Sequence, residues 1–393
     1  MACASWDKTI RIYAFDRNAS GTATSPLVRI ADAATDHIKA VAYDHQSKTL
    51  VTGGSDLHVR AWDLEPLLSH VAELEDAEWL QLVAEGKGRK GADLPTMRSL
   101  GILRAHTRPI TKIVPLVHRY PEGERSHRTG TIFSGDSLGR VLESRLCISG
   151  EGKDLQATFN IRRELRGHET SISDMRVTRG IDDSVPLEEE SAGTYFKLWT
   201  ASNDRTAMCF DILPPSWPGA AKQKKPRAQI DRSSKAGPVL GEEPPLLASN
   251  VLQHDDYVLS VLPLSKDVVP GEAELVLTGT ASEEICVWDE ELAQEEAQTN
   301  SKIRDIKGNA LPSKEMAHQG LLRRREGHWH EVTALGEWKR TKTGPLADAE
   351  SDEDLAGAGH SLLWVVSASY DGSIRRWPLP GECNTALRTF SNG

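Results

Sequence analysis

The chain lacks the features that mark membrane proteins, secreted proteins and metal-binding domains. It contains no run of about eighteen apolar residues, so the sequence predicts no membrane span. The N-terminus has no basic segment followed by an apolar core, and a secretory signal is not expected. Five scattered cysteines form no CxxC pair, which favours a reducing compartment and argues against a structural zinc site.

Aromatic residues are scarce, at 6%, and positive charge is not in excess. The formal net charge of −10 argues against a surface that coats nucleic acid, so direct nucleic-acid binding is not expected. Hydrophobic residues make up 38% of the chain, which is enough for a core. At 393 residues the chain could hold two ordinary domains or one large closed β-architecture.

The chain does contain one short pattern in six copies. In each copy a small residue and an Asp close a tight turn, and an aromatic or large apolar residue follows six positions later; in the fifth copy a Ser replaces the Asp. The copies run from Asp7 to Tyr13, Asp56 to Trp62, Asp136 to Leu142, Asp204 to Phe210, Ser282 to Trp288 and Asp371 to Trp377. Fixed internal spacing with variable distances between copies is typical of a repeat protein.

Short apolar runs precede these turns and predict antiparallel strands. Strands directly before the turns are expected at 49–54, 130–135, 196–202, 274–280 and 362–369. Earlier strands, which alternate with a period of two, are expected at 38–43, 110–116, 172–177, 257–264 and 332–338. A His precedes each of the earlier strands: His37, His106, His168, His254 and His328.

Two GH dipeptides, at 167–168 and 327–328, and two WD dipeptides, at 62–63 and 288–289, complete the pattern. The chain resembles the WD-repeat (WD40) β-propeller family, whose repeats run from a GH to a WD and form four-stranded blades. The resemblance covers nearly the whole chain outside its insertions. It implies an all-β fold of four-stranded antiparallel blades, about five complete and one partial at the N-terminus.

The resemblance also implies a hydrogen-bonded set of His, Ser or Thr, Asp and Trp in each blade. The residues that match this set are His37, Thr52, Asp56, Trp62, His168, Thr200, Asp204, His254, Thr278, Trp288, His328, Ser367, Asp371 and Trp377. Phe210, Ser282 and Leu142 depart from it. A set that recurs in blade after blade predicts a structural role and not a catalytic triad, which an enzyme needs once. A metal site at His328 and His330 is not expected, because no third ligand is close in sequence.

The copies lie further apart than the repeat length of about forty residues requires. The excess lies in insertions after the third strand of a blade, at 66–97, 213–246 and 290–320, and between its first two strands, at 118–129, 179–193 and 340–360. In a four-stranded meander both kinds of connection lie at the same end. We therefore expect one compact face and one face that carries the long insertions.

The insertions differ in composition. Residues 67–85 predict an amphipathic helix, which either packs on its own propeller or docks a partner. Residues 213–246 are expected to be disordered, and Lys222, Lys224, Lys225 and Arg227 within them form a candidate nuclear-localisation signal or a chance basic run. Residues 340–360 are expected to be acidic and disordered. Ser351 there is a candidate phosphorylation site, the alternative being a purely solubilising loop.

The first copy begins almost at its Asp turn, and residues 384–390 read as the outer strand of the last repeat. The innermost strand of the first blade and the His before it are missing. Two interpretations follow: the recorded chain begins inside a seven-bladed ring, which we favour, or the ring has six positions with a degenerate first blade.

With no catalytic constellation and no cofactor motif, the sequence predicts a non-enzymatic protein–protein interaction scaffold, a subunit of an intracellular complex in the cytoplasm or nucleus. The alternatives are a nuclear ribosome-biogenesis or RNA-processing scaffold and a substrate adaptor of a ubiquitin ligase. Against the adaptor, the Arg usual two residues after its WD dipeptide is replaced by Glu65 and Glu291. Residues beside the turns are predicted to contact partners: Trp6, Lys8, Leu57, Asn203, Arg205, Glu283, Trp329 and Tyr370.

Overall fold

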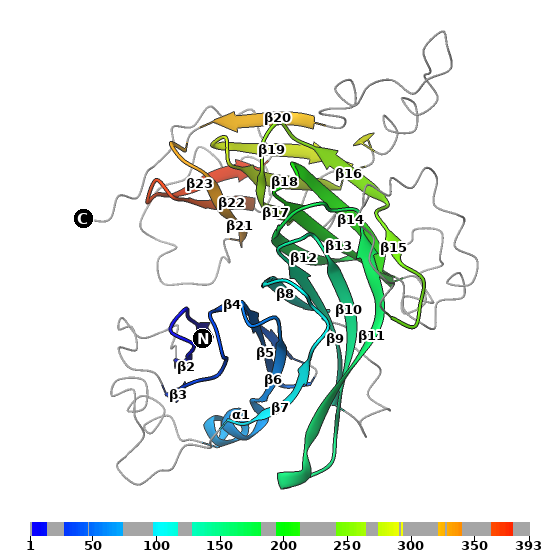
Figure 1. Cartoon of the computed structure of the whole chain (residues 1–393). Helices are drawn as coiled ribbons and strands as arrows, with labels where there is room; N and C mark the ends of the chain where they lie inside the picture. Colours follow the sequence, from blue (N-terminus) through cyan, green and yellow to red (C-terminus); the bar gives the residue numbers. More distant parts are fainter. Residues whose placement is uncertain are drawn as a thin grey trace. The chain divides into compact units, whose positions relative to one another are not determined.

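The computed structural model describes residues 2–13, 27–45, 47–73, 97–116, 128–181, 194–212, 241–264, 274–290, 292–293, 321–326, 328–339 and 363–379. These residues form strands β1 to β23, the helix α1 and a short 3-10 helix, η2 (Figure 1). The chain divides into two compact units, each treated by itself below. Unit 1 comprises Met1–Val177 and Ile230–Leu247; unit 2 comprises Thr178–Gln229 and Ala248–Gly393.

Unit 1 contains three sheets. The first is β1 (Ala2–Ala4), β2 (Ile10–Ile12) and β3 (Val28–Ile30); the second is β4 (Ile38–Asp44), β5 (Thr49–Gly54), β6 (Val59–Asp63) and β7 (Ser99–Leu103). The third is β8 (Ile110–Leu116), β9 (Arg128–Asp136), β10 (Val141–Ser149) and β11 (Gln156–Arg166), with η2 (Gly152–Asp154) between the last two. A fifth strand, β15 (Leu246–Leu247), pairs parallel to the end of β11.

Unit 2 repeats this arrangement. Strand β12 (Ile172–Ile181) runs across the division and begins the sheet β12-β13-β14-β16, with β13 (Thr194–Ser202), β14 (Thr206–Ile212) and β16 (Asn250–Gln253). The next sheet is β17 (Val258–Pro263), β18 (Leu275–Thr280), β19 (Glu284–Asp289) and β20 (Leu321–Glu326). The last is β21 (Val332–Lys339), β22 (Leu363–Ser369) and β23 (Ile374–Leu379). The predicted all-β fold of four-stranded antiparallel blades is confirmed.

Neighbouring sheets within a unit pack through apolar side chains on both faces of their central strands. In unit 1 one core cluster joins residues of β4–β7, such as Val59, to residues of β8–β11, such as Ile132. In unit 2 a cluster joins Trp199 of β13 to Trp288 of β19. Because β5 and β6 are covered on both faces, every residue in them is buried; β5 is apolar or small throughout, and the charged Arg60 and Asp63 of β6 are paired with Asp56 and Arg128.

At two places, a glycine near the end of a second strand leaves space for the first residue of the following sheet. A Cβ added to Gly53 would lie 2.9 Å from the side chain of Ile110, which begins β8. Gly279 stands in the same way 2.7 Å from Val332, which begins β21. Contacts this short leave no room for any side chain, so glycine at these positions is required by packing and not by a turn.

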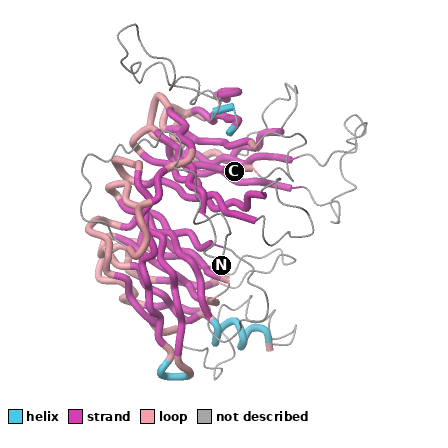
Figure 2. Tube along the Cα trace, turned by 90° about the vertical axis from the view of Figure 1, so that its right-hand side faces the viewer, coloured by secondary structure: helices cyan, strands magenta, loops and turns pink. Residues whose placement is uncertain are grey.

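The long connections join first to second strands and third to fourth strands, as the sequence predicted. The connections from second to third strands, such as 55–58, and from fourth strands to the first strand of the next sheet, such as 104–109, are all short; 45–48 and 150–155 are the short connections of the other two kinds. Because consecutive strands alternate in direction, the connections from second to third and from fourth to first strands lie at one end of a sheet, which we call the short-loop end. Figure 2 shows the described loops of each unit, in pink, gathered at one end of the strands, apart from the connection that carries η2.

The described parts of the insertions pack on their own units. Helix α1 (Glu65–Ala72) begins two residues before the predicted start, with Pro66 in its first turn, and its Leu67 packs with Ile12 and Leu64. Residues 241–246 were expected to be disordered, and this is wrong: the Glu243 N–H donates to the Arg162 carbonyl at 2.8 Å, and β15 follows. An ion pair between these two side chains, at 2.6 Å, fixes the segment along β11.

Several predictions lie outside the described residues. They are the remainder of the predicted helix from 74 onwards, the basic cluster Lys222, Lys224, Lys225 and Arg227, the acidic segment with Ser351, and the outer strand at 384–390.

Candidate interaction surface

The turns at the short-loop ends are closed by their Asp side chains. Asp204 Oδ1 accepts the backbone N–H of Thr206 at 3.0 Å, and Asp371 Oδ1 accepts that of Ser373 at 2.8 Å. The same bond, with the N–H two residues after the Asp, recurs at Asp7 and Asp56. Each turn is therefore held by its own side chain, which fixes the residues that protrude from it.

The residue after the Asp adopts a left-handed backbone conformation in each of these turns. Its φ is 66° at Lys8, 69° at Leu57, 70° at Arg205 and 78° at Gly372, and Glu283, after Ser282, has 71°. Four of the predicted partner-contact residues thus occupy a conformation that side chains other than glycine rarely adopt. The backbone, and not only the side chain, distinguishes these positions.

The third copy is aligned differently in the sheet from what the sequence spacing suggested. In β5 and β6, Leu50, two positions before Thr52, pairs with Trp62. In β9 and β10, the residue two positions before Ser134 pairs with Ser144. Ser144 therefore occupies the Trp position.

Assigning Leu142 to the aromatic position was wrong by two residues. Asp136, at the end of β9, follows the hydroxyl residue Ser134 by two positions, whereas Asp56 follows Thr52 by four. From there its Oδ1 accepts the N–H groups of both Leu138 and Arg140, at 2.9 and 3.2 Å. The turn is closed by the same chemistry from a shifted position.

The last copy contains the complete hydrogen-bonded set. His328 Nδ1 lies 3.0 Å from Asp371 Oδ2, and His328 Nε2 lies 2.6 Å from Ser367 Oγ. Trp377 Nε1 donates to the same Ser367 oxygen at 2.7 Å. A carboxylate can only accept, so His328 donates from Nδ1 and accepts the Ser367 proton at Nε2.

The fifth copy retains the set with one replacement. Thr278 Oγ1 lies 2.7 Å from His254 Nε2 and accepts the Trp288 N–H at 2.8 Å. In the place of an Asp-closed turn, Thr280 Oγ1 accepts the Glu284 N–H at 3.3 Å and lies 3.0 Å from Ser282 Oγ. The hydroxyl of Thr280 thus takes over part of the missing carboxylate's role.

The fourth copy has no Trp to bond to its hydroxyl residue, Thr200. His168 and Thr200 are buried, and Thr200 Oγ1 donates to the Met208 carbonyl at 3.3 Å. Phe210 is fully buried at the Trp position, as its pairing with Leu198 shows.

His37 in the second copy does not match the position of the other His residues. His106, His168, His254 and His328 each stand four residues before the first residue of a strand, and in the second copy that position holds Ala34. His37 is exposed, and its Nδ1 lies 2.6 Å from the Trp6 carbonyl oxygen. Asp56 instead accepts the Thr35 N–H at 3.2 Å and pairs with Arg60 at 2.6 Å.

His106, Ser134 and Asp136 form a set that the sequence did not assign. His106 Nδ1 lies 3.0 Å from Asp136 Oδ2, and its Nε2 lies 2.8 Å from Ser134 Oγ. The signal was the distance from His106 to the strand that begins at Ile110, which equals the distance in the later copies. The misplaced aromatic position concealed it.

These sets are built for packing and not for nucleophilic catalysis. The side chains of His106 and His328 are 0% exposed, so no substrate could reach the hydroxyls that they bind. Burial lowers the pKa of His328, which favours the neutral ring. Burial alone would raise the pKa of Asp371, but hydrogen bonds from Ser373 and the Trp329 N–H outweigh it and hold that pKa well below the usual range.

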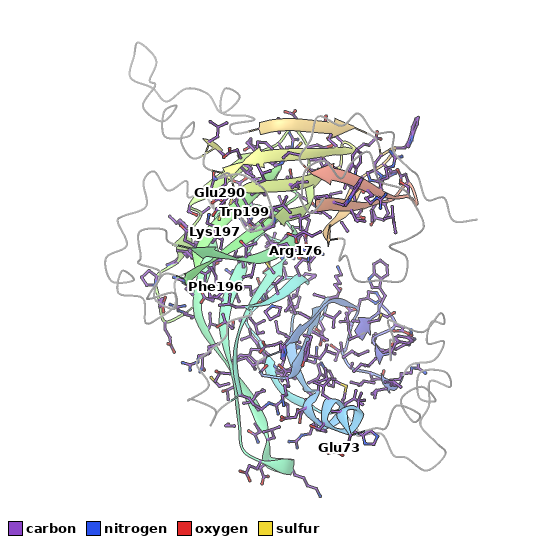
Figure 3. The ribbon with its side chains drawn as sticks, turned by 180° about the vertical axis from the view of Figure 1, so that it is seen from behind. Glu73, Arg176, Phe196, Lys197, Trp199 and Glu290 are labelled. Carbon is purple, nitrogen blue, oxygen red and sulfur yellow. The ribbon has the colours of Figure 1, made fainter. Side chains whose placement is uncertain are left out.

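A second buried polar cluster lies at the other end of the strands in unit 2. The ammonium of Lys197 lies 2.8 Å from Glu290 Oε1 and also contacts the carboxylate of Glu274. Figure 3 labels Lys197 and Glu290 in the same region of unit 2 as Trp199. Burial raises the pKa of Glu290 to about 8. The Lys197 ammonium lowers this pKa but does not offset burial, since it is shared with Glu274.

The predicted partner-contact residues differ in exposure. Trp6, Trp329 and Tyr370 are 70%, 82% and 71% exposed. Arg205 and Glu283 are exposed, whereas Lys8, Leu57 and Asn203 are half-buried. Among the described residues no group of three or more His, Cys, Asp or Glu side chains is arranged to hold a metal ion. No helix in the described ranges is long and apolar enough to cross a bilayer.

Comparison with known proteins identifies one repeat directly. Residues 26–63, which include β4, β5 and β6, match the family model described as "WD domain, G-beta repeat". This segment is a WD repeat. The match confirms the resemblance inferred from the sequence, and WD-repeat domains in general are non-catalytic and mediate protein–protein interaction.

Among solved structures, the crystal structure of the WD40 beta propeller domain of Doa1 is similar to this chain, with 14% identity and a TM-score of 0.43. The alignment covers 99% of this chain and 78% of that chain. No curated protein sequence matches the chain.

Proposed function

We propose that this chain is a non-enzymatic scaffold that binds other proteins, as a subunit of an intracellular multiprotein complex. The supporting observation is the contrast at the short-loop ends. The polar residues of the repeat bond to one another inside the sheets, while Trp329 and Tyr370 protrude from loops that those bonds hold. Large exposed aromatic side chains on a rigid frame are common anchors of protein interfaces.

The proposed contact residues lie beside the turns of each unit, unit by unit. These are Trp6, Lys8, Leu57, Asn203, Arg205, Glu283, Trp329 and Tyr370. Because the turn fixes the backbone conformation of Lys8, Leu57, Arg205 and Glu283, binding through these residues would not require their backbone to be ordered first.

Affinity purification of the tagged full chain from cells of its source, followed by mass spectrometry, tests this function. We expect one set of proteins that co-purifies with the wild-type chain at physiological salt and is lost with Trp329→Ala/Tyr370→Ala. The control is Ile374→Ala, which shortens another exposed side chain of the same sheet. Identical sets from wild-type chain and double variant would contradict the proposed surface.

The proteins recovered also decide between the kinds of complex. Ribosome-assembly factors would favour the nuclear scaffold, and cullin-type ligase subunits would favour the substrate adaptor. For localisation, we propose that 222–227 directs a nuclear fraction of the protein. An unchanged distribution of a fluorescent fusion after deletion of 222–227 would remove that part of the proposal.

A further inference from the structure

Two of the most exposed large side chains in the described residues stand on loops of unit 2 that bond to one another. The Trp329 N–H donates to Asp371 Oδ2 at 3.0 Å, and Tyr370, next to Asp371, donates its N–H to the Glu331 carbonyl at 3.2 Å. The His330 ring meets the Tyr370 ring edge-on, with centroids 5.9 Å apart. The two loops are therefore fastened together, and Trp329, His330 and Tyr370 form one patch, which we call the aromatic patch.

The loops of the preceding sheet adjoin this patch. Val332, at the start of β21, accepts a hydrogen bond from Ser260 Oγ at 3.2 Å and packs against Gly279. The turn that carries Glu283 follows Gly279 within four residues, and its Ala281 N–H donates to the Tyr257 carbonyl at 3.0 Å. Tyr257, 47% exposed, is a further aromatic residue in these adjoining loops.

The charged side chains of the loops that carry these rings have one sign, and the nearby Arg375 is paired with Asp371 at 3.7 Å. The loops 254–257, 281–283, 328–331 and 370–373 contain no Lys or Arg. They contain Asp255, Asp256, Glu283 and Glu331, in addition to Asp371, which is committed to His328 and the turn. The loops that carry the rings thus contain several carboxylates and no Lys or Arg.

We propose that the aromatic patch and its carboxylates bind an extended segment of a partner protein rich in Lys and Arg. This inference rests on the proposed scaffold function and specifies its partner. The face of an indole or phenol ring attracts a cation through its quadrupole, and nearby carboxylates attract the same charge. An acidic segment would be repelled by Glu283 and Glu331, and a purely apolar one would leave them without a partner.

A direct binding experiment with the full chain tests the proposal. The probe is a fluorescein-labelled peptide of alternating Gly and Arg, twelve residues long, followed by anisotropy. Trp329→Ala/Tyr370→Ala is expected to raise the dissociation constant about 10-fold, as the loss of two exposed cation–π contacts predicts. Glu283→Gln/Glu331→Gln is expected to raise it several-fold and to reduce its dependence on salt.

Two controls separate this patch from the overall negative charge of the chain. Tyr43→Ala removes an exposed aromatic ring of β4 that is not among the proposed contact residues, and it should leave the dissociation constant unchanged. A Gly-Glu peptide of the same length should not bind. The variants alter exposed side chains, apart from the half-buried Glu331, whose replacement by Gln keeps its size, so their melting temperatures should equal that of the wild-type chain.

Absence of binding by the Gly-Arg peptide, or equal binding by wild-type chain and Trp329→Ala/Tyr370→Ala, would overturn the proposal. So would concentration-dependent dimerisation that the same variant abolishes, because a second copy would then occupy the patch. If partners that co-purify are lost in this variant but the Gly-Arg peptide does not displace them, the scaffold function stands and the basic partner is wrong.

Discussion

Replacing Glu290 with Gln is expected to remove a loss of stability that the wild-type chain suffers as pH rises from about 5 to about 8. Glu290 shares the ammonium of Lys197 with Glu274, and burial raises its pKa from 4.5 to about 8. Glu290 is the more buried of the two carboxylates, so it is the one that keeps its proton.

The sign follows from proton linkage. A carboxyl whose pKa is higher in the folded than in the unfolded state binds more protons when folded, so its contribution is full at low pH and falls as pH rises through the folded pKa. For a single group the free energy of unfolding can fall by at most about 1.4 kcal/mol per pH unit. The pH range over which Glu290 lowers the free energy of unfolding runs from its unfolded pKa of 4.5 to its folded pKa of about 8.

The measurement is urea unfolding of wild-type chain and Glu290→Gln at half-unit intervals between those limits, followed by circular dichroism. The difference in unfolding free energy between the two proteins isolates Glu290 from the other titrating groups. Glu274→Gln is the matched control, since it leaves Lys197 to Glu290 alone and should lower the pKa of Glu290 and flatten the curve. A difference between wild-type chain and Glu290→Gln that is flat, or that grows in favour of the wild-type chain with rising pH, would refute the reasoning.

Three further predictions concern the repeat. Ser144→Ala should raise the free energy of unfolding by up to about 1 kcal/mol in urea titrations, because the Ser144 hydroxyl is buried with no hydrogen-bond partner among the described residues; a decrease in that free energy would instead show that the hydroxyl has a partner. Glu283→Gly should raise it by about 1 kcal/mol and Gly372→Ala should lower it, because both residues have positive φ, at 71° and 78°; equal signs in thermal melts would contradict this. Trp288→Phe should lower it by about 1–2 kcal/mol, since the ring remains but its hydrogen bond to Thr278 is lost; Phe210→Leu serves as the control for packing without that bond.

The strands were predictable because their signal is repeated and local. The alternation that predicted strands at 38–43 and 110–116 recurs as β4 and β8, nearly residue for residue. Side chains two residues apart on a strand lie on the same face, so a shift by two leaves the hydrophobic pattern intact. That is why Leu142 passed for the aromatic position while Ser144 occupied it.

Features in loops were harder to predict, since loops have no period. His37 lies three residues away from the position of the other His residues, and only the strand bounds reveal that Ala34 stands there. The left-handed conformation at Leu57, Arg205 and Glu283 carries no glycine to mark it. The exposure of Trp329 and Tyr370 also depends on how loops of neighbouring strands meet, which the sequence does not record.

The glycine position that receives the next sheet has a consequence for how such a chain can grow. Gly53 leaves the space that Ile110 fills, and Gly135 leaves the space that Ile172 fills, while Ile110 and Gly135 belong to the same sheet. A segment copied whole would therefore bring both halves of the joint with it. Tandem duplication of one such segment could lengthen the protein without redesign of any interface, whereas exchange of a single strand could not.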